Sequence, residues 1–222
     1  MMKSKTVITA VLCVVVAVWT ADVQAAFVVE AHSSGLANAN FSGTARETDY
    51  PSKAIGLTAS GSVFGSTDPA SHSYTYSYTP GVDVDNVPLS AGIDLGNGDL
   101  AMGLVGGSTG LYNVYITWPS ATNVNLSGCR ITVTSDGADI VLDPVDMNTG
   151  GTGNPGGNDA WLQIASGISL TSGVTYTVDQ LANSTAYVSQ RSHGVMWEVV
   201  PEPATLALMS LGVLCLCRRR HR

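Results

Sequence analysis

Short runs with a two-residue period dominate the middle of this 222-residue chain. In SYTYSYT, Tyr74, Tyr76 and Tyr78 alternate with small hydroxyl residues, so a strand would place the three rings on one face. Similar runs separated by short turn clusters are LYNVYITW, CRITVTS, ADIVL, AWLQIAS, VTYTVDQ and GVMWEVV. No stretch has helical apolar spacing over three turns, so the pattern predicts an all-β fold, an antiparallel β-sandwich of the jelly-roll kind.

The run LYNVYITW is the strongest prediction of a core strand. Tyr112, Val114, Ile116 and Trp118 fall on one of its faces, and we expect Trp118 to be buried with Ile116 and Val114.

Two irregular regions interrupt the pattern. Residues 33–73 alternate weakly, and residues 148–157 contain five glycines and a proline, which predicts a mobile loop. Loops at the ends of a sandwich are where ligands usually bind.

The N-terminus predicts export. An apolar run over residues 7–19 follows two lysines, and it is shorter than the roughly 20 residues that a membrane span needs. Small residues precede a cleavage site between Ala25 and Ala26. Residues 1–25 are therefore a predicted signal peptide, a helix recognised by the secretion machinery, and residues 26–200 form the predicted body.

Charge and cysteine content narrow the function of the body. Residues 26–200 hold fifteen acidic side chains and a net charge of about −11, which argues against nucleic acid as a partner. Cys129 is the only cysteine of the body, so no disulfide forms inside it, and we expect a small buried thiol. The four basic residues of the body are Arg46, Lys53, Arg130 and Arg191.

Residues 110–200 resemble a known domain family. The strand that ends in Trp118-Pro119, the following turn and Thr/Val strand, and the later tryptophan strand NDAWLQIASGISLTSG are similar to the golvesin C-terminal-like domain. That family is a galactose-binding-like β-sandwich attached to bacterial polysaccharide lyases and other secreted proteins. The resemblance implies a noncatalytic, carbohydrate-facing module.

The C-terminal residues 201–222 resemble the PEP-CTERM sorting signal of Gram-negative bacteria. Pro201, Glu202 and Pro203 precede an apolar run and a terminal cluster that contains Arg218, Arg219 and Arg220. The resemblance implies recognition by exosortase, a membrane protease-transpeptidase, and a version of the motif is also associated with ice-binding proteins. As a helix, the 14-residue apolar segment 204–217 spans only about 21 Å of a ~30 Å hydrocarbon core. This length predicts a transient anchor in the inner membrane, and a permanent anchor is the alternative.

The sequence matches catalytic motifs only weakly. The G-x-S-x-G match at 106–110 precedes a strand instead of following one, and the G-x-G-x-x-G match at 151–156 contains a proline and precedes no helix. The histidines His32, His72, His193 and His221 lack metal-site spacing, and we expect His72 and His193 to be ordinary strand or turn residues.

Two acidic stretches collect the oxygen ligands that Ca²⁺ prefers, DVDN at 83–86 and DPVDMN at 143–148. Turn formation by Asp and Asn is the favoured alternative, because neither stretch is an EF-hand loop. The Tyr74, Tyr76 and Tyr78 face could stack on sugars or be buried in the core.

These observations predict a noncatalytic protein without a cofactor, sorted to the cell surface or extracellular matrix, with a structural or glycan-interacting role in the envelope or polysaccharide matrix. Its expected partners are the secretion machinery, exosortase, the membrane in transit and extracellular polysaccharide. The alternatives are a polysaccharide hydrolase or lyase and, least favoured, an ice-binding protein, which would need a flat Thr-rich face.

Overall fold

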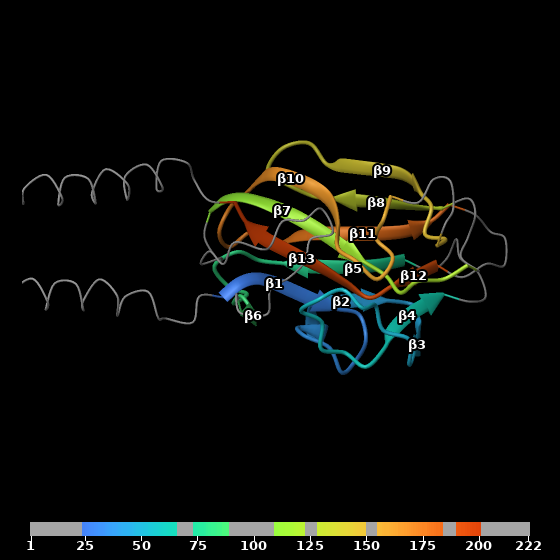
Figure 1. Cartoon of the computed structure of the whole chain (residues 1–222). Helices are drawn as coiled ribbons and strands as arrows, with labels where there is room; N and C mark the ends of the chain where they lie inside the picture. Colours follow the sequence, from blue (N-terminus) through green and yellow to red (C-terminus); the bar gives the residue numbers. More distant parts are fainter. Residues whose placement is uncertain are drawn as a thin grey trace, which may run out of the picture.

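The computed structural model describes residues 24–65, 73–88, 109–122, 128–149, 155–183 and 190–200, and they form three antiparallel sheets (Figure 1). Sheet A has the strand order β10-β7-β13-β1-β6, sheet B has the order β2-β5-β11-β8-β9, and sheet C has the order β12-β4-β3. The elements are β1 Gln24–Glu30, the short 3-10 helix η2 Asn38–Asn40, β2 Phe41–Gly43, β3 Arg46–Thr48, β4 Ser62–Gly65, β5 Ser73–Tyr78, β6 Val87–Pro88, β7 Gly110–Thr117, β8 Cys129–Val133, β9 Ile140–Val145, β10 Leu162–Leu170, β11 Tyr176–Ala182, β12 Gln190–Ser192 and β13 Gly194–Val199.

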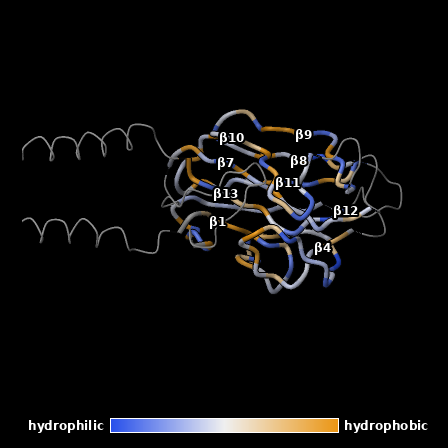
Figure 2. The backbone as a smooth tube through the Cα atoms, viewed as in Figure 1, coloured by the Kyte–Doolittle hydropathy of each residue, from blue (hydrophilic) through white to orange (hydrophobic). Residues whose placement is uncertain are grey.

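The core lies between the facing sides of sheets A and B. Alternate residues of each strand point into it, and Figure 2 shows hydrophobic and hydrophilic positions interleaved along the strands. Aromatic rings join the two sheets, because Phe27 of β1 stacks on Tyr78 of β5 at 5.0 Å between ring centroids and Trp197 of β13 lies 5.5 Å from the same tyrosine. The predicted sandwich-like, all-β body is therefore confirmed.

The outer face of sheet A is also buried. Val28, Tyr115 and Met196 project to this side from β1, β7 and β13, and each is at most 2% exposed. They pack against Trp161 and against residues 52–59, which we call the cover segment. The indole nitrogen of Trp161 donates to the Ile55 carbonyl at 2.9 Å, so the cover segment is held by polar as well as apolar contacts.

The outer face of sheet B is polar. The strand register aligns Ser42 of β2, Thr75 of β5, Asp179 of β11, Thr132 of β8 and Val141 of β9 in one cross-strand row. Side chains in such a row share a face, and these five are exposed or half-buried. Asp179 accepts hydrogen bonds from the Thr75 hydroxyl at 2.6 Å and from the Thr177 hydroxyl at 2.9 Å.

The structure confirms the prediction for Trp118. Its side chain is fully buried at the end of β7, an interior strand of sheet A, and it shares the core with Val114 and Ile116. The indole nitrogen donates to the Met147 carbonyl at 3.2 Å and to the Asn158 side chain at 2.9 Å.

The described part of the region 33–73, which leaves out residues 66–72, is more ordered than its weak alternation suggests. It contains η2 and the strands β2, β3 and β4, which have three or four residues each and are too short to show a period. Of the predicted mobile loop at 148–157, residues 150–154 lie outside the described residues. Its flanks contact the core edge, because Thr149 N–H donates to the Ala121 carbonyl and Trp118 N–H to the Gly157 carbonyl.

The predicted signal helix and C-terminal hydrophobic helix lie outside the described residues. Strand β1 begins at Gln24, two residues before the predicted body, and Ala26 is buried opposite Glu198 of β13. In the ranges that the structure describes, no helix has the length and hydrophobicity of a membrane span.

Candidate functional site

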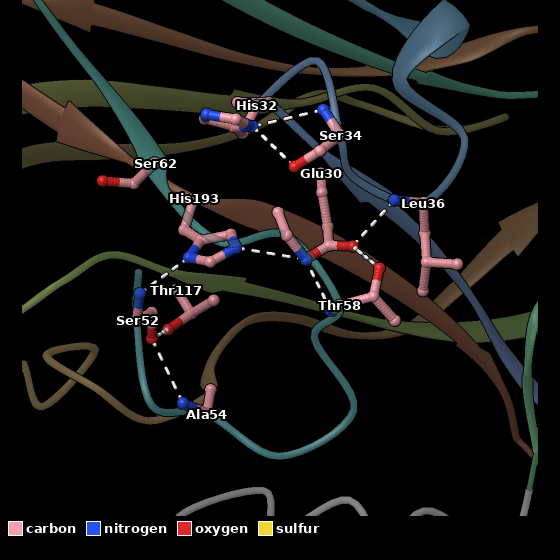
Figure 3. Close-up of polar contacts among 12 residues, drawn as sticks. Glu30, His32, Ser34, Leu36, Ser52, Ala54, Thr58, Ser62, Thr117 and His193 are labelled. Carbon is pink, nitrogen blue, oxygen red and sulfur yellow. Dashed lines mark hydrogen bonds and ion pairs between the residues drawn. The ribbon is translucent and has the colours of Figure 1, made fainter. Parts of the chain in front are cut away.

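A buried carboxylate and a buried imidazole meet beneath the cover segment (Figure 3). Glu30 ends β1 and His193 lies between β12 and β13, and neither side chain is exposed. The carboxylate accepts five hydrogen bonds, from His193 Nε2 at 3.1 Å, Leu36 N at 2.7 Å, Thr58 N at 3.0 Å, Thr58 Oγ1 at 2.7 Å and Ala59 N at 3.0 Å. Gly35 permits this close turn, because a Cβ there would overlap the Glu30 side chain.

These bonds stabilise the charged form of Glu30. Burial alone would raise the pKa of the carboxyl, but the hydrogen bonds from His193, Leu36, Ala59 and Thr58 outweigh it and lower the pKa to about 2. Because all the donors come from the protein, Glu30 is a buried anion with its hydrogen-bonding capacity filled. This arrangement ties the cover segment to sheet A.

The geometry differs from a catalytic triad. His193 Nδ1 accepts the backbone N–H of Ser52 at 2.7 Å, so the proton of a neutral imidazole sits on Nε2 and is donated to Glu30. The Ser52 hydroxyl instead bonds to the Thr117 hydroxyl at 2.7 Å and accepts from Ala54 N–H at 3.2 Å. An imidazole used in this way has no free nitrogen to activate the serine. The cluster is therefore a structural network.

Sequence reasoning missed this network. We expected His193 to be an ordinary strand or turn residue, but it links three separate segments of the chain. One signal was present, because a glutamate inside the apolar run FVVEA needs buried partners. His32 lies apart from the network, with Nδ1 2.8 Å from the Ser34 hydroxyl and Nε2 3.5 Å from Glu47. His72 and His221 lie outside the described residues.

The tyrosine face cannot stack on sugars. Tyr74, Tyr76 and Tyr78 are at most 1% exposed and point into the core from β5, so that alternative was wrong. Burial raises the pKa of Tyr76, and its hydroxyl donates to Ser192 at 2.6 Å. Cys129 is buried as expected, and burial likewise raises the pKa of its thiol, which disfavours the reactive thiolate.

The first acidic stretch, 83–86, lies in the bend and loop before β6, and the second, 143–148, begins in β9 and continues into the bend after it. Asp83 accepts from Thr79 N–H at 2.7 Å and from Asn40 at 3.1 Å, and Asn86 bonds to both the N–H and the carbonyl of Val28. Asp146 accepts from the backbone and side chain of Asn148. No group of three or more His, Cys, Asp or Glu side chains placed for a metal occurs in the described part of the chain.

The residues of the export signals are only partly visible. The predicted cleavage site at Ala25 and Ala26 falls within β1, and cleavage there stays a prediction. The predicted sorting residues lie outside the described residues; they are Pro201, Glu202, Pro203, Arg218, Arg219 and Arg220. The last described contact before them is a hydrogen bond from Val200 N–H to the Leu111 carbonyl.

A solved structure shares the fold at low sequence identity. A Paenibacillus xanthan lyase is similar over 82% of this chain, with a TM-score of 0.54 and 16% identity, and this chain spans 14% of the lyase. A Podospora anserina GH26-CBM35 β-(1,4)-mannanase matches 81% of this chain and 29% of its own, with 16% identity and a TM-score of only 0.37. The likeness to the lyase shows a common fold and nothing finer.

No curated protein matches this chain in sequence. Its end does match a family, because residues 199–222 fit the PEP-CTERM protein-sorting motif. That motif implies processing by exosortase and export to the cell surface. The match begins at Val199, the last residue of β13, so the sorting motif follows the β-sandwich directly.

Proposed function

We propose that this protein is a noncatalytic component of the cell surface or extracellular matrix that contacts polysaccharide. The observation that carries the proposal is the PEP-CTERM motif joined directly to a folded β-sandwich. The body fold, shared with part of a xanthan lyase, and the resemblance of residues 110–200 to the golvesin C-terminal-like domain support the contact with polysaccharide. That resemblance also favours a galactose-binding-like jelly roll.

The two alternative functions have less support. For a hydrolase or lyase, the strongest acid-base pair among the described residues is Glu30 with His193, and it is sealed beneath the cover segment. For an ice-binding protein, the best Thr-rich surface is the outer face of sheet B. Its central row contains Asp179, which engages the Thr75 and Thr177 hydroxyls and interrupts the Thr ladder.

The sorting step is tested by the mass of the surface protein. We expect the surface fraction to lack the peptide ATLALMSLGVLCLC, because exosortase would cut near Pro203. Glu202→Ala removes the recognition element, and deletion of 218–222 removes the charge that holds the tail in the cytoplasm. Both changes should leave full-length protein in the inner membrane.

A matched control is Ser210→Ala, which lies in the apolar run outside the Pro-Glu-Pro and arginine elements and should be sorted normally. Finding the tail peptide still joined to surface-exposed protein would show a permanent anchor and contradict the sorting step.

The glycan contact is tested separately, by binding of the purified protein to a panel of neutral and acidic polysaccharides with and without Ca²⁺. Binding to none of them would leave only a structural role.

A further inference from the structure

Sheet C presents a cross-strand row of two arginines and a phenylalanine. The register of its strands places Arg46 of β3 and Arg191 of β12 directly opposite Phe64 of β4, on its two sides. Directly opposed residues of antiparallel strands project from the same face. With two strand spacings between them, the Cα atoms of the arginines are about 10 Å apart.

This row faces outward. The neighbouring row of the same sheet consists of Glu47, Val63 and Ser192, and Val63 and Ser192 are buried, so that row is on the core side. In the outward row, Arg46 is exposed and the other two side chains are half-buried. Phe64 is thus an aromatic side chain on an outer face, whereas the tyrosines of β5 are in the core.

A second aromatic residue is bonded through its backbone to the strand that carries Phe64. The Ser62 hydroxyl, which is on the same face as Phe64 two residues along β4, donates to the Tyr50 carbonyl at 2.5 Å. The Tyr50 side chain is 69% exposed. Partial burial lowers the pKa of Arg191, and a Coulombic interaction with Tyr50 opposes that change. We call Tyr50, Arg46, Phe64 and Arg191 the sheet C patch.

The patch is a basic spot on an acidic body. It holds two of the four basic residues in 26–200, against fifteen acidic ones. Lys53 is paired with Asp159 at 3.5 Å, whereas no described carboxylate lies at ion-pair distance from Arg46. A broad polyanion such as nucleic acid would meet the repulsion of the whole body, while a narrow chain with spaced carboxylates can reach Arg46 beside Arg191 and stay clear of most of the acidic surface.

The patch also lies at the end of the body opposite Val199, where the sorting motif begins (Figure 1). Strand β13 ends at Val199, where the motif begins, and its other end at Gly194 follows β12 after one residue. Six residues of strand separate the two ends by about 20 Å. Figure 1 shows sheet C at the end of the body opposite the end of β13. A body attached through its C-terminus would therefore present the patch outward.

We propose that the sheet C patch binds an acidic polysaccharide, one that carries carboxylate-bearing sugars. Arg46 pairs with a carboxylate through its planar fork of N–H donors, Arg191 adds positive charge beside it, and Phe64 and Tyr50 pack on the apolar faces of the sugar rings. This inference rests on the proposed contact with polysaccharide and adds to it the ligand class and the residues that select it.

The test is calorimetric titration of the full chain, purified in detergent, with polygalacturonate, neutral dextran and single-stranded DNA. We expect the wild type to bind polygalacturonate more tightly than the other two. Arg46→Gln should weaken that binding about tenfold, the effect of losing one charge-assisted contact. Tyr50→Ala should weaken it severalfold, and because both side chains are exposed, thermal unfolding of both variants should match the wild type.

Arg130→Gln is the matched control. Arg130 is an exposed arginine on the outer face of sheet B, so this variant has the same charge change at a distant site and should bind within about twofold of the wild type. Equal losses in Arg46→Gln and Arg130→Gln would show attraction by overall charge and overturn the proposal. DNA binding that depends on Arg46 would also overturn the proposal. Binding of dextran but not of polygalacturonate would contradict the ligand proposed for the sheet C patch and leave the proposed contact with polysaccharide standing. Binding of neither glycan would contradict both proposals.

Discussion

The two large sheets face the same core but differ on their outer sides. Sheet A carries Val28, Tyr115 and Met196 on its outer side, sealed by the cover segment and Trp161, whereas sheet B carries a mostly polar row in contact with solvent. The difference is visible in the strand sequences. FVVE and GVMWEV are nearly continuous apolar runs, and SYTYSY alternates strictly. A strand buried on both faces loses the two-residue period that marks a half-buried strand.

The cover itself is held by a charge. Its apolar contribution is small, because Ala54 is the one buried residue that it adds to the apolar cluster on this face and Leu57 is partly exposed. The backbone N–H groups of Thr58 and Ala59 bond to Glu30, and that of Ser52 bonds to His193. A short polar segment therefore stays on an apolar sheet because buried polar partners in the sheet satisfy its backbone.

Removing the charge should have the largest effect. We expect Glu30→Gln to destabilise the protein by about 5 kcal/mol, the upper end of the range for breaking a buried pair, since an amide group presents N–H to the N–H donors around it. Urea unfolding at neutral pH measures this loss, and hydrogen exchange should accelerate at Thr58 and Ala59. Glu47→Gln, at an exposed carboxylate, is the control and should cost less than about 1 kcal/mol. Equal losses in the two variants would contradict the role of the network.

The same carboxylate predicts a pH dependence. Its pKa falls from 4.5 to about 2 on folding, so its contribution is complete above pH 4.5 and is lost as the pH falls toward 2. The difference corresponds to about 3 kcal/mol. Unfolding measured between pH 6 and 2 should show the wild type losing this much more stability than Glu30→Gln, about 3 kcal/mol. Parallel pH curves for the two proteins would show that Glu30 is not the titrating group.

Replacing Trp118 comes next, because its ring fills the core that both sheets share. Trp118→Ala should cost about 4 kcal/mol by removing a fully buried side chain. Trp118→Phe keeps most of the ring but loses the hydrogen bonds to Met147 and Asn158, and about 1–2 kcal/mol is expected. If both changes cost the same, the hydrogen bonds and not the packing would account for the stability of this corner.

The sequence predicts which side chains face the core better than it predicts which are buried on an outer face. Alternation correctly assigned Tyr112, Val114, Ile116 and Trp118 to the core, because that pattern needs only the strand itself. It could not show that Tyr115 is buried on the opposite face, since the covering residues lie some 60 positions earlier in the chain. The buried network and the sheet C patch were missed for the same reason, as each depends on pairing between distant short segments. The sorting motif, a contiguous pattern, was found in full.

Substitutions that remove buried side-chain volume from the outer face of sheet A should destabilise the protein. Met196→Ala is expected to cost about 3 kcal/mol, because the side chain is fully buried between β13 and the cover segment. Met196→Leu conserves the volume and should cost less than about 1.5 kcal/mol. Urea midpoints at constant slope measure both effects. A negligible loss in Met196→Ala would mean that the cover is open in solution.

The equivalent change on sheet B should have the smallest effect. Thr132 is half-buried on the outer face of β8, between Asp179 and Val141 in the cross-strand row. Thr132→Ala removes a methyl and a hydroxyl from a solvated surface and lowers the strand propensity slightly, so a change of no more than about 0.5 kcal/mol is expected. The same urea titration compares it directly with Met196→Ala. A loss above about 1.5 kcal/mol would mean that this face is covered in the folded protein, and the contrast between the two sheets would then be wrong.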